Sequence, residues 1–160
     1  MTAPAVAVGA DLGFVRPPRL FVRWLIVFAG CAAAAGSLLV ALGSSGLPEP
    51  GLQAALVAWI TLPCIVAGVI AWARRPDSRF GPLMVAAGFA IFLSSLQWSS
   101  AGVPYTVGLA FDLLPAALFL HLFLAYPSGR LMLRREQLVV AAAYGAAVGL
   151  QLVKMLLGSG

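Results

Sequence analysis

Asp112 is the residue best placed to do chemistry, because it is the only acidic residue inside a long apolar run of this chain. A carboxylate is costly in hydrocarbon, and such a residue indicates a functional site by default. The preceding apolar run, which runs in the opposite direction, carries Ser94, Ser95 and Gln97 at a comparable depth. We therefore expect these four residues to form an outward-opening polar pocket that senses a ligand, protons or lipid state. The alternative is that Asp112 only holds two helices together, which typically contributes ~0.6–2 kcal/mol.

The other reactive side chains are few and scattered. His121 is the single histidine, and at ~100° per residue it lies on the helix face opposite Asp112. We expect His121 to be a packed polar residue that is bonded to a neighbouring helix. Cys31 and Cys64 lie inside apolar runs and are predicted to be small packing residues. The sequence has no phosphate-binding glycine loop and no metal-spaced cluster, so no catalytic residue, metal or cofactor is predicted.

The composition indicates which solvent surrounds the helices that carry these residues. The 160 residues are 62% hydrophobic and only 9% charged, whereas about 25% of the residues of a soluble domain are charged. The apolar runs also lack the polar stripe that a soluble helical bundle would need. About 20 apolar residues cross the hydrocarbon core of a bilayer as a helix. We predict an all-α, polytopic transmembrane bundle with a flexible arm at residues 1–19 and five spans, at residues 20–43, 52–73, 81–99, 107–126 and 138–157.

The arginines lie before the first span, after the second and after the fourth. Since arginine and lysine are enriched in cytoplasmic loops, we expect the N-terminus and these loops on the cytoplasmic side of the plasma (inner) membrane. The lipid bilayer is then the main partner, and the arginines anchor to phosphate headgroups. The net charge of +5 reflects this topology, and no nucleic-acid partner is predicted. The inner-loop anchors are Arg74, Arg75, Arg79, Arg130, Arg134 and Arg135.

Small residues and prolines predict how the spans pack. Ala141, Gly145 and Gly149 are spaced by four residues in the fifth span, and such a stripe lets two helices approach closely. We expect the stripe to pack within the bundle or to form the seam of a homodimer. Pro63 and Pro115 each remove a backbone hydrogen bond in the middle of a span, where they can kink the helix.

Two loops carry distinctive motifs: RRPDSRFG at residues 74–81 opens the third span, and YPSGRL at residues 126–131 closes the fourth. Over residues 72–135 the chain resembles the N-terminal membrane region of actinobacterial sensor histidine kinases. In that group an Arg-Pro-Asn/Asp turn leads into an Ile/Phe-Gly helix start, and a Phe/Tyr-Pro-x-Gly-Arg turn ends a later helix. The resemblance implies a membrane input module of a two-component system, which passes an envelope stimulus to a kinase domain in cis or in trans.

The predicted topology places a condition on this function. The fifth span ends outside, so a cytoplasmic kinase domain in the same protein would require one more crossing. We therefore expect either a fragment that lacks a sixth helix or a shortened relative that keeps only the membrane module. The alternative is a small standalone integral membrane protein, such as a transporter accessory subunit or a scaffold. A transporter proper is disfavoured, because the spans show no inverted repeat.

Overall fold

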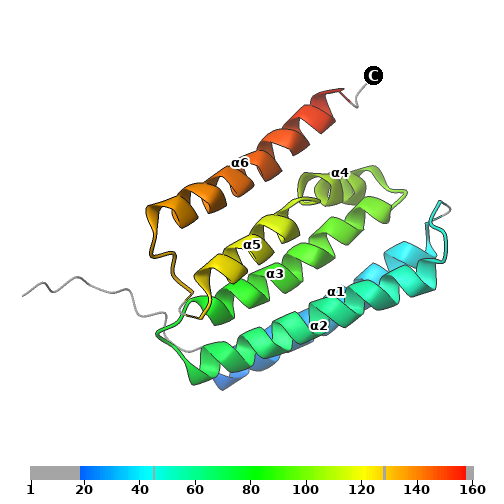
Figure 1. Cartoon of the computed structure of the whole chain (residues 1–160). Helices are drawn as coiled ribbons and strands as arrows, with labels where there is room; N and C mark the ends of the chain where they lie inside the picture. Colours follow the sequence, from blue (N-terminus) through cyan, green and yellow to red (C-terminus); the bar gives the residue numbers. More distant parts are fainter. Residues whose placement is uncertain (1–18, 45, 128, 158–160) are drawn as a thin grey trace, which may run out of the picture.

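The computed structural model describes residues 19–44, 46–127 and 129–157, so the predicted arm lies outside the described residues except for Arg19. The described part is all-helical, and five of its helical segments are long and apolar enough to cross a membrane. The predicted fold class is therefore confirmed. The elements are α1 (Leu20–Leu42), α2 (Pro50–Arg74), α3 (Phe80–Ser95), the 3₁₀ helix η1 (Leu96–Trp98), α4 (Gly102–Ala110), α5 (Leu114–Ala125) and α6 (Arg134–Leu157) (Figure 1).

The fourth span is broken in two, where the sequence predicted one helix over residues 107–126. A turn of three residues, Phe111 to Leu113, separates α4 from α5. Pro115 has no N–H, so the carbonyl of Phe111 cannot receive the usual helical bond from it. That carbonyl instead accepts the N–H of Leu114 at 3.2 Å, in a tighter turn. Asp112 therefore lies in a gap between two helices. Pro63, in contrast, lies within the continuous helix α2.

Helix α6 begins four residues earlier than predicted, because a side chain caps its start. Glu136 Oε2 accepts the backbone N–H groups of Met132 and Leu133, each at 3.1 Å. These donors would otherwise lack partners at the beginning of a helix. Arg134 and Arg135 therefore belong to the first turn of α6 rather than to the preceding loop.

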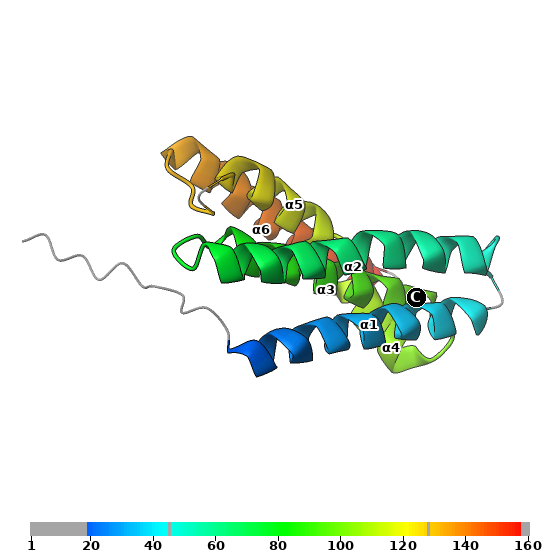
Figure 2. The ribbon, with the colours of Figure 1, turned by 90° about the horizontal axis from the view of Figure 1, so that it is seen from below.

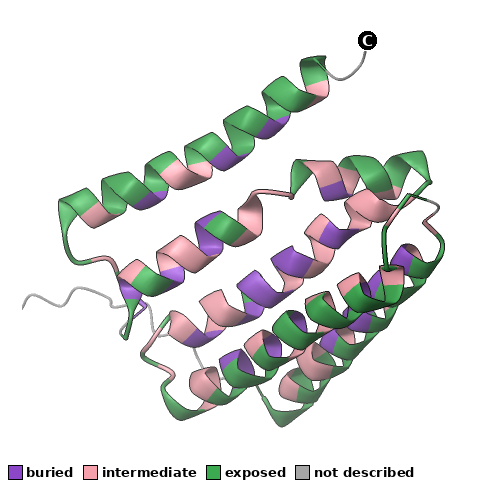
Figure 3. Ribbon diagram, turned by 45° about the vertical axis from the view of Figure 1, so that its right-hand side comes forward, coloured by how far each residue is buried: buried purple, intermediate pink, exposed green. Residues whose placement is uncertain are grey.

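The spans are arranged in order across the molecule. Helices α1 and α2 pack side by side, α3 packs against both, α5 packs on α3, and α6 packs on α5 and α4 (Figures 1 and 2). Small side chains fill the centre, where Ala87 and Ala90 of α3 meet Leu118 and Leu122 of α5. Helix α6 is thus at the edge of the bundle, and its buried residues form one narrow line along it (Figure 3).

The outer faces of the helices carry large apolar side chains that are exposed. Phe21, Trp59 and Phe123 are 75%, 78% and 78% exposed, and exposed residues cover the outward side of the bundle (Figure 3). A continuous apolar surface of this extent requires hydrocarbon rather than water. The chain therefore has the architecture of a multi-pass membrane protein.

All the described arginines gather at one end of this bundle. The start of α1, the α2–α3 loop and the α5–α6 loop lie at the same end, while the α1–α2 and α3–α4 loops lie at the other (Figure 1). We call these the basic end and the far end. Their separation follows from the alternating arginine clusters in the sequence.

Candidate functional site

Three polar side chains from three separate segments meet at the far end of the bundle. The amide Nε2 of Gln97 in η1 donates to Asp112 Oδ1 at 2.8 Å. Lys154 Nζ of α6 lies 3.7 Å from Asp112 Oδ2, and the two side chains are 55% and 30% exposed. We call Gln97, Asp112 and Lys154 the outer polar cluster. It joins the third, fourth and fifth spans through one carboxylate.

The close approach of α4 to η1 brings Gln97 to Asp112. Gly108 is buried in α4, and a Cβ there would collide with the backbone of Leu96 and Gln97. Because glycine has no side chain, the two backbones can touch. The break after Ala110 then turns the chain so that Asp112 lies beside the amide. The cluster therefore depends on both Gly108 and the interruption of the fourth span.

Lys154 is a member of the cluster that the sequence analysis missed. It lies on one face of α6 with Tyr144 and Gln151, because steps of seven and three residues return to the same side of a helix. Gln151 is only 4% exposed, and its Oε1 has no hydrogen-bond partner within the described residues. The polar spacing in residues 144–154 could have predicted this inward face, because polar groups in a span turn toward protein rather than lipid.

The predicted serine partners of Asp112 are wrong. Ser95 Oγ lies 2.9 Å from Ser37 Oγ of α1 and donates to Phe92 O at 2.7 Å. Ser94 Oγ donates to the carbonyl of Ile91 at 2.9 Å, within its own helix. The physical reason is helix geometry: at ~100° per residue, Ser95 and Gln97 lie about 200° apart, so Gln97 faces α4 while Ser95 faces α1. Of the predicted pocket residues, only Gln97 and Asp112 come together.

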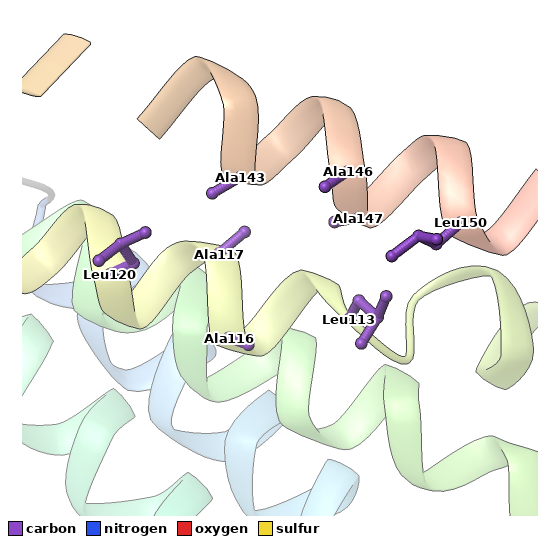
Figure 4. Close-up of a pocket in the computed structure, with 8 residues that line it drawn as sticks. All are labelled: Leu113, Ala116, Ala117, Leu120, Ala143, Ala146, Ala147 and Leu150. Atoms are coloured by element: carbon purple, nitrogen blue, oxygen red, sulfur yellow. The ribbon is translucent and has the colours of Figure 1, made fainter. Parts of the chain in front are cut away.

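A second polar contact attaches α6 at mid-span. His121 Nδ1 of α5 lies 3.3 Å from Tyr144 Oη, and the two rings meet edge to face at 6.0 Å. This confirms the prediction of a packed histidine bonded to a neighbouring helix. Between the two polar contacts α5 and α6 leave an apolar cavity of about 210 Å³ (Figure 4). Its lining is Leu113, Ala116, Ala117, Leu120, Ala143, Ala146, Ala147 and Leu150.

The small-residue stripe of α6 faces away from the bundle. Ala141, Gly145 and Gly149 are all exposed, and a Cβ on either glycine would have nothing within 4 Å. The expectation that the stripe packs within the bundle is therefore wrong. The reason is that the polar residues of the same helix occupy the inward face, which leaves the small residues on the other side. The homodimer seam stays a prediction.

A hollow lined by several polar residues lies beside the outer polar cluster. It has a volume of about 260 Å³ and lies between the α1–α2 loop and the end of η1. Gln97 belongs both to this hollow and to the cluster, so a molecule bound there would contact the residue whose amide binds Asp112. The hollow is lined by Ser44, Gly46, Leu47, Gln97, Trp98, Ser99 and Ser100.

At the basic end the two motif loops interlock. Gly129 has φ +71, which L side chains rarely adopt, and a Cβ there would collide with the backbone of Arg79 and Phe80. Ser78 Oγ donates to Pro127 O at 3.4 Å, and the Phe80 and Tyr126 rings meet edge to face at 5.6 Å. We call this contact the inner junction; Ser128 of the second motif lies outside the described residues. The predicted anchors around it, Arg74, Arg75, Arg79, Arg130, Arg134 and Arg135, are all exposed.

The ion pair of the outer polar cluster leads to a testable prediction. Asp112→Asn keeps an oxygen for Gln97 but removes the charge that faces Lys154, and Lys154→Met removes the cation. A double-mutant cycle, measured as reversible unfolding in bilayer nanodiscs, should give a coupling energy of about 0.5–1 kcal/mol. Additive effects of the two substitutions would show that the pair does not hold α6.

No family model, curated protein or solved structure matches this chain. The resemblance of the two basic loops to sensor kinases therefore stays a prediction from the sequence. The function has to be inferred from the contacts that the chain's own residues make.

Proposed function

We propose that this chain is the membrane input module of a two-component sensor histidine kinase. It receives a stimulus at the far end of the bundle and passes it to a kinase domain, in cis or in trans. In this proposal the chain carries no catalytic residue. The chain transmits a structural change from the outer polar cluster to the inner junction.

The placement of Asp112 carries the proposal. Broken spans form the substrate and ion sites of many secondary transporters, and a carboxylate within a span is costly to keep without a role. The Asp112–Lys154 pair is partly exposed, and exposed pairs contribute only about 0.2–1 kcal/mol. A modest stimulus, such as a polar molecule that binds the hollow and displaces Gln97, is enough to break it.

The packing of α6 supports a movable role for this helix. It contacts only α4 and α5 among the described elements, and its polar attachments are the ion pair with Asp112 and the Tyr144–His121 contact. Loss of the pair frees the far half of α6, while the apolar cavity beside Ala147 gives the helix room to shift. Helix α6 begins at Arg134, shortly after Gly129 of the inner junction, so its tilt acts on that junction.

The basic end faces the cytoplasm in this proposal, as the positive-inside bias favours. The hollow and the outer polar cluster then face the envelope, where a stimulus arrives. Helix α6 ends at the far end, so a kinase domain in the same protein would follow a further crossing, and a kinase in trans would bind the inner junction. A second copy of the chain would bind the exposed stripe of Ala141, Gly145 and Gly149.

The orientation is tested by cysteine accessibility. In a background with Cys31→Ala and Cys64→Ala, a membrane-impermeant maleimide should label Glu49→Cys in intact cells. It should label Asp77→Cys only after the cells are opened, because Asp77 lies in the basic α2–α3 loop. Labelling of Asp77→Cys in intact cells would reverse the proposed topology.

The signalling role is tested by kinase output in membranes of the native host, with the chain in its natural reading frame. Asp112→Asn and Lys154→Met break the same pair, so both should change histidine autophosphorylation in the same direction. The expected change is about fivefold, the lower range of an allosteric coupling. Glu49→Gln is the matched control, since Glu49 is an exposed carboxylate in the α1–α2 loop.

Two outcomes would contradict the signalling role. If both variants give the same output as Glu49→Gln, the outer polar cluster is a structural contact. If no histidine phosphorylation depends on the chain at all, the standalone membrane protein is the better account.

A further inference from the structure

We propose that the basic end of the bundle holds a binding site for one anionic phospholipid. One acyl chain lies in an apolar groove between α3 and α5, and the phosphate lies against Arg79 and Arg130. This inference does not depend on the signalling role, because it concerns other residues at the opposite end of the molecule.

The groove has the size and lining of a lipid site. Its volume is about 390 Å³, within the range of about 300–1,000 Å³ that is typical of ligand pockets. It begins at Phe80 and Tyr126 and continues along α3 and α5 toward the bundle centre, because α3 runs away from the basic end and α5 runs toward it. Apart from the Tyr126 hydroxyl its lining side chains have no polar oxygen or nitrogen: Phe80, Met84, Phe119, Leu122, Phe123 and Tyr126.

The groove opens to the membrane rather than to another part of the protein. Phe123 and Tyr126 are 78% and 70% exposed. On α5, Ala117 and His121 face α6. Because successive residues are ~100° apart around a helix, the groove residues of α5 lie on a different face. A lipid tail can therefore enter from the bilayer without displacing α6.

The charge at the mouth of the groove selects the headgroup. Arg79 precedes Phe80 directly, and Arg130 follows Gly129, whose backbone packs against Arg79 and Phe80. Arg79 and Arg130 are both exposed, and the backbone segments that carry them are in contact with each other. Asp77 is the one acidic residue of these two loops, and Glu136 of the first turn of α6 is bound to the backbone N–H groups that it caps. A phosphate with a net negative headgroup fits this arrangement better than a zwitterionic one.

Native mass spectrometry of the full chain tests the site. The chain is released from vesicles that hold equal amounts of phosphatidylglycerol and phosphatidylcholine with matched acyl chains. We expect one retained phosphatidylglycerol per chain. Met84→Trp fills the groove and should reduce the retained lipid about tenfold, whereas Leu39→Trp adds the same ring to an exposed position on α1 and should change nothing.

Arg79→Gln tests the headgroup contact separately from the groove. It should lower the preference for phosphatidylglycerol about fivefold, the effect of one basic residue near a membrane surface. Arg74→Gln is the matched comparison: it removes the same charge at the same end of the bundle but from α2, which does not line the groove, so it should lower the preference less than Arg79→Gln does. Equal retention by the Met84→Trp and Leu39→Trp chains would overturn the site, as would equal retention of the two lipids. A change in chain dimerisation with unchanged lipid retention would also overturn it, in favour of a second copy in the groove.

Discussion

Hydrocarbon cannot hydrogen-bond or ionise its solutes, and this one constraint orders the whole structure. It requires helices, since only they satisfy their backbone groups within each span. It also requires the polar side chains within the spans to find one another. Asp112, Gln97 and Lys154 meet at the far end, His121 and Tyr144 meet at mid-span, and Ser37 meets Ser95 on the other side of α3. Each of these contacts joins separate segments of the bundle.

The same constraint gives α6 its unusual position. Its buried face combines Gln151 with the apolar residues Val140 and Ala147, and Tyr144 and Lys154 add polar contacts to α5 and to Asp112. An open apolar pocket of about 210 Å³ lies between α6 and α5 beside Ala147. In the proposed function, a helix that is held at its far end by a partly exposed ion pair, and preceded by two interlocked loops, transfers a small movement across the membrane.

The sequence was sufficient for the spans and for the gathering of arginines at one end, because both follow from how residue types partition between water and lipid. It indicated a kink at Pro115 but not a full break, which depends on the tight turn at Phe111. It predicted Gln97 as a partner of Asp112 but wrongly grouped Ser95 with it, although a spacing of two residues puts the two side chains about 200° apart on a helix. The small residues Gly145 and Gly149 were wrongly expected to face the bundle for another reason. Tyr144, Gln151 and Lys154 lie on the other side of the same helix, and the polar contacts of Tyr144 and Lys154 turn that side toward the bundle.

The distance between the far ends of α4 and α6 tests the central claim most directly. Spin labels at Val103→Cys and Val153→Cys, both exposed positions, in a chain with Cys31 and Cys64 replaced by alanine, would report that distance in nanodiscs by pulsed electron resonance. A single narrow distribution is expected for the otherwise unaltered chain and for Glu49→Gln. Asp112→Asn should lengthen and broaden it, because the far half of α6 loses its ion pair. A distribution that Asp112→Asn leaves unchanged would contradict the account.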